Sequence, residues 1–534
     1  MKRPELSSTD NNNRPIEEVE MDVEEQETQV PKKLQAVGTT SPNKNSATNG
    51  KKKSNTIEDQ IFEDAWEDEY ESENEVSIES DRENETEQNM DMVMDEIEKE
   101  NNQDPDTAAA EDEEKVYLPG DKLEEGEQLQ VDNSAYHMLH SINVNWPCLS
   151  FDIIPDNLGT DRTKFPHTMY LFTGTQASQT DKNEVMVMKL SHLHRTINDD
   201  KEGSDIEDND EDLDDDPLLE TRTMKQMGGT NRARVYSSPE SILGATWSER
   251  GKVHIWDISH AIKSLEVPGY IVPQSAQKPL FSVSTHADEG FALDWSRNSA
   301  RLLSGDFNKL IYLTVPRGNS GFTTDSMPFR GHKSSIEDIQ WSPEEQSVFA
   351  SCSADQTVKL WDIRSPKHRC ALDAHVHTDD VNVISWNRRV RYLMASGCED
   401  GSFAVWDLRT WSTNPQTQKP SPVATFKWNA GPVTSIEWDP TDDSVLALSG
   451  ADDQLTIWDL SVEQDTEQQQ QQKQNDKVNV MIGPDGQPRQ VPPQLLFIHQ
   501  GQQNIKELHW HPQIPGSIVS TAATGFNVFK TISV

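Results

Sequence analysis

Histidine, serine, aspartate and tryptophan recur in the second half of the chain at spacings that permit a continuous hydrogen-bonded chain. The two clearest sets are His332, Ser351, Asp355 and Trp361, and His375, Ser396, Asp400 and Trp406. An imidazole can bridge a carboxylate and a hydroxyl, and that hydroxyl can also accept a hydrogen bond from an indole N–H. Such a chain satisfies polar groups that would otherwise be buried without partners. We therefore predict that these side chains are structural and neither catalytic nor metal-binding.

Two histidine pairs could hold a metal, because residues two apart on a strand point to the same side. The pairs are His192 with His194 and His509 with His511. Zinc needs three or four protein ligands, and the sequence offers no further ligand at suitable spacing. The sequence also lacks GxSxG, Walker-type, GxGxxG and CxxC motifs. We expect no enzyme, no cofactor and no metal.

An acidic segment near the N-terminus carries aromatic side chains at helical spacing. Phe62, Trp66 and Tyr70 lie four residues apart. The acids between them are Glu63, Asp64, Glu67, Asp68 and Glu69. A basic partner with an apolar groove could take the aromatic face while its Lys and Arg pair with the acids. We predict docking of a basic protein here. The alternative is a solvated acidic tail.

A second acidic stretch and a lysine run could also serve a partner. The stretch ends in Asp208, Asp210, Glu211, Asp212, Asp214, Asp215 and Asp216. It could cover a basic protein, or it could be a solubilising insertion. Lys51, Lys52 and Lys53 fit a nuclear-import signal, although short lysine runs also arise by chance in polar tails.

Charge and composition limit the classes of partner. The chain of 534 residues has 92 acids and 48 bases, a formal net charge of -44, and only 33% hydrophobic residues. Residues 16–27, 58–134 and 199–216 together account for a net charge of -45. Such a field repels phosphate, which argues against direct nucleic-acid or anionic-membrane binding and favours a basic protein client. Four scattered cysteines and a start without an apolar segment predict an intracellular, reduced protein.

The tryptophans also define a repeat. Trp-Asp pairs begin at residues 256, 361, 406 and 458, and related strand ends occur at Tyr312 and Phe529. Periods of about 40–45 residues with this signature indicate WD40 blades of four antiparallel strands. Two earlier strands, near 170–173 and 185–190, raise the count to seven blades. We predict an all-β, seven-bladed WD40 β-propeller.

The predicted domain organisation places the propeller in residues 133–534 and a disordered acidic region in residues 1–132. An acidic insertion is expected at about 196–226 and a Gln-rich loop at about 462–494. A short N-terminal helix is expected over 133–142. We assign the apolar stretch 149–154 to the outer position of the last blade, where it would close the ring.

Several motifs resemble one family. The stretches NWPCLSF (145–151) and NRARV (231–235) are similar to those of histone-binding WD-repeat proteins of the retinoblastoma-binding and chromatin-assembly type. The acidic-aromatic segment 61–70 and VYLPG (116–120) resemble the glutamate-rich WD-repeat subfamily of ribosome-assembly regulators. The resemblance implies a chaperone for a basic large-subunit ribosomal protein, acting indirectly on pre-ribosomal particles. It also implies a nuclear and nucleolar location, with shuttling to the cytoplasm left open.

Two other functions remain open at this point. One is a histone chaperone or chromatin adaptor, because histones are as basic as ribosomal proteins. The other is a substrate receptor of a cullin-RING ubiquitin ligase, because Trp361–Arg364 and Trp406–Arg409 match a WDxR box. An Arg after this strand is also frequent in propellers of other functions.

Overall fold

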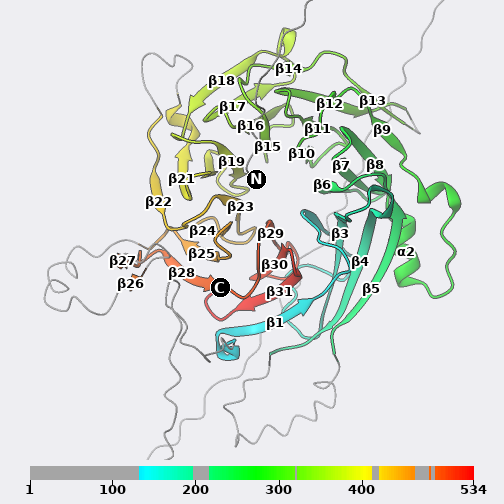
Figure 1. The fold of residues 1–534 in the computed structure, drawn as a ribbon, viewed down its shortest axis with the longest axis horizontal. Helices are drawn as coiled ribbons and strands as arrows, with labels where there is room; N and C mark the ends of the chain where they lie inside the picture. The colour runs from blue at the N-terminus through cyan, green and yellow to red at the C-terminus, as the bar shows by residue number, and fades with distance from the viewer. Residues whose placement is uncertain (1–130, 197–215, 319–320, 412–419, 463–479, 483–487) are drawn as a thin grey trace, which may run out of the picture. The chain divides into compact units, whose positions relative to one another are not determined.

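The computed structural model describes residues 131–196, 216–318, 321–411, 420–462, 480–482 and 488–534. The predictions for residues 51–53, 62–70 and 208–215 lie outside these ranges. Within them, seven antiparallel sheets are arranged in a ring around a central axis (Figure 1). The predicted seven-bladed, all-β propeller is therefore confirmed.

Each blade is a sheet with its first strand innermost. Blade 1 holds β2 (Phe151–Ile154), β3 (His167–Gly174), β4 (Glu184–Leu193) and β5 (Leu218–Lys225). Blade 2 holds β6 (Thr230–Ser237), β7 (Ile242–Ser248), β8 (Lys252–Asp257) and β9 (Phe281–Val283). Blade 3 holds β10 (Ala292–Trp295), β11 (Leu302–Gly305), β12 (Leu310–Pro316), β13 (Phe322–Thr324) and β14 (Phe329–Arg330).

The remaining blades follow the same order. Blade 4 holds β15 (Ile336–Trp341), β16 (Val348–Ser353), β17 (Thr357–Asp362) and β18 (Cys370–His375). Blade 5 holds β19 (Val381–Trp386), β20 (Leu393–Cys398), β21 (Ser402–Asp407) and β22 (Ala424–Lys427). Blade 6 holds β23 (Val433–Trp438), β24 (Val445–Gly450), β25 (Leu455–Asp459) and β28 (Leu495–His499). Blade 7 holds β29 (Glu507–Trp510), β30 (Ser517–Ala522), β31 (Gly525–Thr531) and β1 (Tyr136–Ile142).

The core lies between neighbouring blades. The middle strands are apolar on both faces because each blade is covered on both sides; all six residues of β24 are buried, for example. The tryptophans of the four Trp-Asp pairs are at most 2% exposed and fill these interfaces. Packing is close enough to exclude even a methyl group at Gly244, where a Cβ would lie 2.3 Å from the Phe172 ring. The structure therefore holds the inner strands in fixed positions around the axis.

The strand that closes the ring differs from the predicted one. The predicted helix over 133–142 is wrong beyond a single 3-10 turn at Asn133–Ala135, because Tyr136–Ile142 forms β1. β1 pairs with β31 across the two ends of the chain, as cyan beside red in Figure 1. Its buried residues, Tyr136, Met138 and Ile142, follow the two-residue period of a strand. Without β1 the backbone of β31 would be an open edge.

The stretch 149–154 was assigned wrongly for the same reason. Phe151–Ile154 forms β2, the innermost strand of blade 1, and pairs with β3. Closure by a strand from the N-terminal side was predicted correctly, but the strand lies one element earlier in the sequence.

Both predicted insertions are shorter than expected. Leu218–Lys225 forms β5, which pairs with β4 over eight residues, so the acidic insertion ends before residue 218. Within the Gln-rich loop, β26 (Val480–Ile482) and β27 (Pro488–Gln490) pair as a two-stranded hairpin. One α-helix, α2 (Ser259–Glu266), and 3-10 turns at Thr180–Lys182, Gln274–Gln277, Pro366–His368 and Leu408–Thr410 complete the described elements. Among these, none is a helix long and apolar enough to cross a membrane.

Candidate partner-binding site

The predicted hydrogen-bonded set is complete in blade 4. His332 Nδ1 lies 3.0 Å from the Asp355 carboxylate, and its Nε2 lies 2.7 Å from Ser351 Oγ. The indole N–H of Trp361 donates to that hydroxyl at 2.9 Å. Burial lowers the pKa of His332 despite the nearby Asp355. The set joins the entry loop and two middle strands of the blade, which is a structural task.

The corresponding set in blade 5 uses a different histidine. The assignment of His375 is wrong: His375 is an exposed residue at the end of β18, and His377 Nε2 lies 2.7 Å from Ser396 Oγ. Trp406 donates to the same hydroxyl at 2.8 Å. The Asp400 carboxylate accepts hydrogen bonds from the Ser402 backbone N–H and hydroxyl.

The spacing to the inner-strand tryptophan could have identified the correct residue. His286, His332 and His377 each precede a tryptophan that ends an innermost strand, at Trp295, Trp341 and Trp386, by the same number of positions. His375 stands two positions too early.

A second hydrogen-bond network, around the central channel, was not predicted. At most junctions an inner-strand side chain accepts from a backbone N–H of the next blade's inner strand. Examples are Asp152 with Val235 N at 2.7 Å and Asp294 with Trp341 N at 2.7 Å. Further examples are Gln340 with Trp386 N, Ser385 with Trp438 N, and Glu437 with Trp510 N. Between blades 2 and 3 the Arg232 Nε instead donates to the Phe291 carbonyl at 2.8 Å.

Glu507 connects three blades at the point where the ring closes. Its carboxylate accepts from Phe151 N at 2.9 Å, Arg232 Nη1 at 2.6 Å and Arg234 Nη2 at 2.8 Å. Burial alone would raise the pKa of Glu507, but the guanidinium groups of Arg234 and Arg232 bring it well below its usual range. The motif NRARV thus acquires a role in this structure, because its two arginines hold the blade 7 carboxylate against blades 1 and 2.

His509 extends this network towards blade 6. Its Nδ1 lies 2.9 Å from Glu437 Oε2, and its Nε2 lies 3.8 Å from Glu507 Oε2. Burial alone would lower the pKa of His509, but the carboxylates of Glu437 and Glu507 outweigh it and raise the pKa to about 10. His509 is therefore a buried cation at neutral pH and serves the ring, not a metal.

We expect His509 to make the stability of the propeller pH-dependent. Because its folded pKa lies above the unfolded value, its contribution is complete below about pH 6.5 and is lost as pH rises through about 10. Between pH 7 and 9 the wild-type protein should lose at least about 1 kcal/mol more unfolding free energy than His509→Gln. Denaturant unfolding at several pH values measures this difference. Parallel pH profiles for the two proteins would contradict the assignment.

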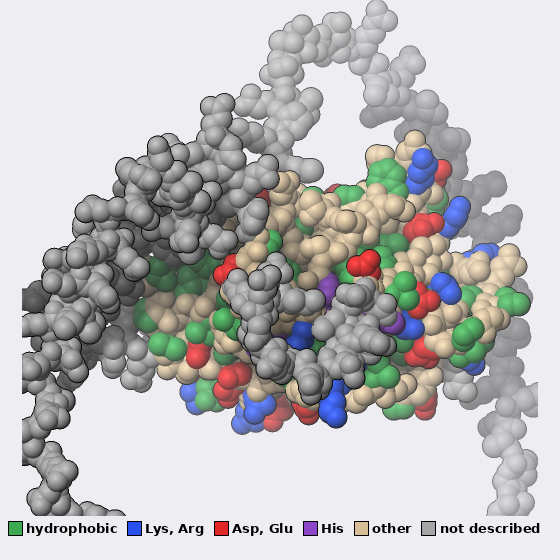
Figure 2. Space-filling view, turned by 90° about the horizontal axis from the view of Figure 1, so that it is seen from below, with side chains coloured by type: hydrophobic (Ala, Val, Ile, Leu, Met, Phe, Trp, Pro, Cys, Tyr) green, Lys and Arg blue, Asp and Glu red, His purple; other side chains and the backbone are tan. Residues whose placement is uncertain are grey.

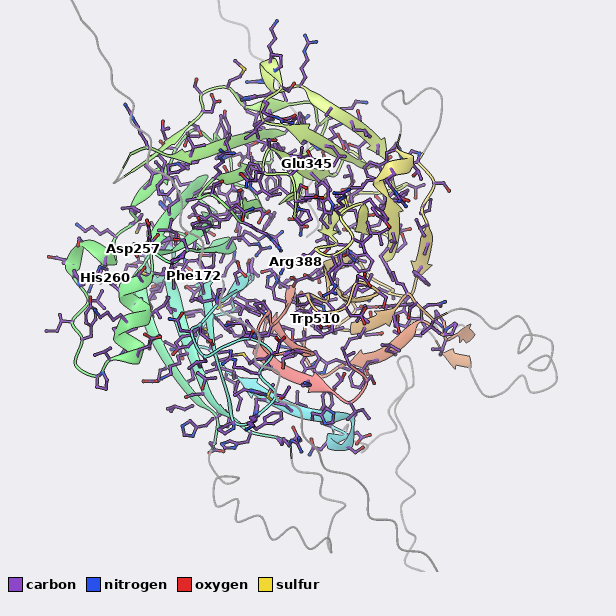
Figure 3. All side chains as sticks on the ribbon, turned by 180° about the vertical axis from the view of Figure 1, so that it is seen from behind. Phe172, Asp257, His260, Glu345, Arg388 and Trp510 are labelled. Carbon is purple, nitrogen blue, oxygen red and sulfur yellow. The ribbon has the colours of Figure 1, made fainter. Side chains whose placement is uncertain are left out.

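The channel ends in a cavity of about 340 Å³. We call the face where the inner strands begin the upper face and the face where they end the lower face. The residues that line the cavity after the strand ends place it at the lower face: Pro155, Ser237, Arg297, Pro343, Arg388 and Pro512. Figure 3 shows Arg388 and Trp510 beside the central opening.

The upper face carries a group of acids in blades 4 and 5. This acidic cluster consists of Glu337, Asp379, Asp380 and Glu399. Burial, with the charges of Asp380 and Glu399, raises the pKa of Glu337. Burial and the neighbouring carboxylates of Asp379, Glu399 and Asp355 raise the pKa of Asp380. Cationic side chains placed here would relieve this mutual repulsion. By contrast, the side wall visible in Figure 2 carries acidic and basic side chains interspersed.

The two WDxR boxes make internal ion pairs. Arg364 binds Asp362 at 2.7 Å and Arg409 binds Asp407 at 2.6 Å, both from Nη2. The guanidinium group of Arg409 also stacks 3.5 Å from the centre of the Tyr392 ring. Both arginines remain largely exposed, but each already has a partner. This geometry is explained within the blade and needs no ligase.

Most predicted partner-binding residues are outside the described ranges. Of the acidic loop only Asp216 is described, exposed and directly before β5. Among described residues, no three or more His, Cys, Asp or Glu side chains are grouped so as to hold a metal ion.

Comparison with known proteins adds the following. A family of histone-binding proteins, described by RBBP4 and the equivalent component of the CAF1 complex, matches residues 126–194, and "WD domain, G-beta repeat" matches 324–362, 367–407 and 420–459. The chain is 46% identical to "Ribosome assembly protein rrb1" of Schizosaccharomyces pombe, over 82% of this chain and 88% of the relative. It is 47% identical to "Glutamate-rich WD repeat-containing protein 1" of Dictyostelium discoideum, over 78% and 85%. It is 24% identical to "Histone-binding protein MSI1" of Saccharomyces cerevisiae, over 62% and 81%.

Proposed function

The chain belongs to the glutamate-rich WD-repeat family of ribosome-assembly proteins, and from this premise we propose that it is a non-enzymatic chaperone for a basic large-subunit ribosomal protein. The observation that carries the proposal is the 46% identity to a ribosome assembly protein across nearly the whole propeller. The client would be kept soluble until it joins a pre-ribosomal particle.

The proposed mechanism is charge neutralisation on a rigid platform. An unassembled ribosomal protein carries many Lys and Arg side chains that bind RNA. The acidic cluster on the upper face and the acidic stretches of the chain would pair with those charges. Each exposed pair contributes only about 0.2–1 kcal/mol, so many pairs are needed. A few buried anchors must supply the remainder, and Phe62, Trp66 and Tyr70 are the proposed ones.

A histone client is the second candidate. It is supported by the match of residues 126–194 to a family described as histone-binding, and by the 24% identity to a histone-binding protein. Core histones would satisfy the acidic surfaces in the same way. Either client implies work in the nucleus, which Lys51, Lys52 and Lys53 would support as an import signal, and the ribosomal client implies the nucleolus.

Affinity purification from a nuclease-treated extract tests the two clients directly. One large-subunit ribosomal protein in stoichiometric amount would establish the first proposal. Recovery of the four core histones instead would replace it with the second. Nuclease treatment is essential, because RNA or DNA would otherwise bridge basic proteins to the acidic chain.

Neutralising the acidic cluster should weaken binding of the purified client. Changing Glu337 and Glu399 to Gln, and Asp379 and Asp380 to Asn, is expected to reduce affinity at least about threefold at ~0.1 M salt, and less at higher salt because screening weakens exposed pairs. The matched control changes two Glu and two Asp in lower-face loops: Glu240, Glu345, Asp442 and Asp443. Equal losses in the two variants would show that only net charge matters.

A further inference from the structure

Two arginines share the lower mouth of the channel although one has no bonded partner. Arg297 follows β10 in blade 3, Arg388 follows β19 in blade 5, and both line the cavity of about 340 Å³. Arg388 donates one hydrogen bond to Glu437, at 3.2 Å. Arg297 makes no hydrogen bond or ion pair with any described residue, although the Asp294 and Glu437 carboxylates lie within electrostatic reach.

Such an arrangement is unfavourable when the cavity holds only water. Burial and the charge of Arg388 lower the pKa of Arg297 to about 10, which shows that the two guanidinium groups repel each other. A mouth residue could avoid this repulsion by extending into solvent. The nearby carboxylates do not offset it fully, because Glu437 is already bonded to His509 and Trp510 N, and burial raises the pKa of Asp294 to about 7.

The remaining polar group at this level is also a donor. The Gln340 side-chain oxygen accepts from Trp386 N at 2.8 Å. Its NH2 group is therefore left as a donor among the residues that line the cavity. Two guanidinium groups and one amide thus offer only N–H donors at one opening, and their natural complement is an anion.

We propose that the lower mouth of the channel binds an oxyanion of the phosphate class, held between the guanidinium groups of Arg297 and Arg388. Each guanidinium presents a planar fork that fits two oxygens. A carboxylate has two oxygens and satisfies one fork, whereas a tetrahedral phosphate has enough oxygens for two. The cavity is larger than a lone phosphate, so the group can be free or attached to an organic compound or phosphorylated side chain.

The overall charge of -44 does not prevent this binding. Exposed charges more than about 10 Å away are largely screened at ~0.1 M salt, so the groups lining the cavity decide its affinity. The proposal is independent of the identity of the basic client, because the acidic cluster lies at the other end of the channel. Failure of one would leave the other intact.

The test uses the full chain and inorganic phosphate, observed by phosphorus NMR line broadening at constant ionic strength. The parent protein should broaden the signal, and Arg297→Gln should bind at least tenfold more weakly. The control is Arg389→Gln, which removes the same charge from an exposed arginine of the neighbouring loop that does not line the cavity. It should bind like the parent. Circular dichroism of both variants establishes that they are folded.

Two results would overturn the proposal: no broadening by the folded parent, or equal affinities of Arg297→Gln and Arg389→Gln. A parallel titration with a phosphoserine peptide identifies the source of the group. Tighter binding of the peptide than of inorganic phosphate, lost in Arg297→Gln, assigns the site to a phosphorylated side chain. Equal or weaker binding of the peptide, with the same dependence on Arg297, assigns it to a free phosphate compound.

Discussion

A chain that begins at Asn143, and so lacks β1, is expected to lose at least about 5 kcal/mol of unfolding free energy relative to a chain that begins at Val131. β1 buries Tyr136, Met138 and Ile142, which are 8%, 0% and 7% exposed. Burial of a large apolar side chain contributes about 1.5–3 kcal/mol, so the three alone account for this loss. The Tyr136 hydroxyl also loses its 2.8 Å hydrogen bond to His499, and β31 becomes an open edge.

Guanidinium unfolding followed by tryptophan fluorescence measures both truncations. The chain from Val131 should unfold at the same denaturant concentration as the full chain, because the described contacts of the propeller lie beyond that residue. The shorter chain should unfold at much lower concentration or fail to fold. If it matched the longer one, another segment would have to close the ring, and the closing role of β1 would be refuted.

Replacing Phe62, Trp66 and Tyr70 by alanine is expected to weaken binding of the purified client at least tenfold. A tenfold loss equals ~1.4 kcal/mol. Three buried aromatic anchors could contribute more, but ordering the segment on binding offsets part of the gain. The net charge stays at -44, so a purely electrostatic tail would tolerate the change. Binding is measured at ~0.3 M salt, where screening weakens the exposed ion pairs.

The control keeps the aromatics and changes Glu63, Glu67 and Glu69 to glutamine. This variant should lose more affinity at low salt than at ~0.3 M salt, since its effect is electrostatic. If the triple alanine variant bound like the parent at ~0.3 M salt, the segment would be an acidic tail without anchors. The proposal that the chain chaperones a ribosomal protein could still stand on the purification experiment.

Local patterns in the sequence were sufficient for the blades. The Trp-Asp pairs, the turn aspartates and the short apolar strands recur because every blade solves the same packing problem with the same side chains. His332, Ser351, Asp355 and Trp361 meet inside one blade, within 30 residues of sequence. A contact formed inside a repeating unit leaves a repeating trace, and such a trace can be read without the fold.

The misassigned elements were those for which local patterns were ambiguous. Residues 136–142 are too few to separate a helix period from a strand period, and an edge left open by the rest of the ring decided between them. His375 and His377 differ by two positions, and only the course of the loop after β18 brought one of them to Ser396.

Tertiary structure alone decided the composition of the channel. Glu507 binds Arg232 and Arg234 across 275 and 273 residues, and Phe151 across 356. Arg297 and Arg388 share one mouth because β10 and β19 end on the same face, two blades apart. Each of these residues occurs once and has no counterpart at the same place in the other blades. The sequence by itself determined the repeated blade, since its stabilising contacts are local; the channel depends on how the whole ring closes, which brings residues from distant blades to one axis.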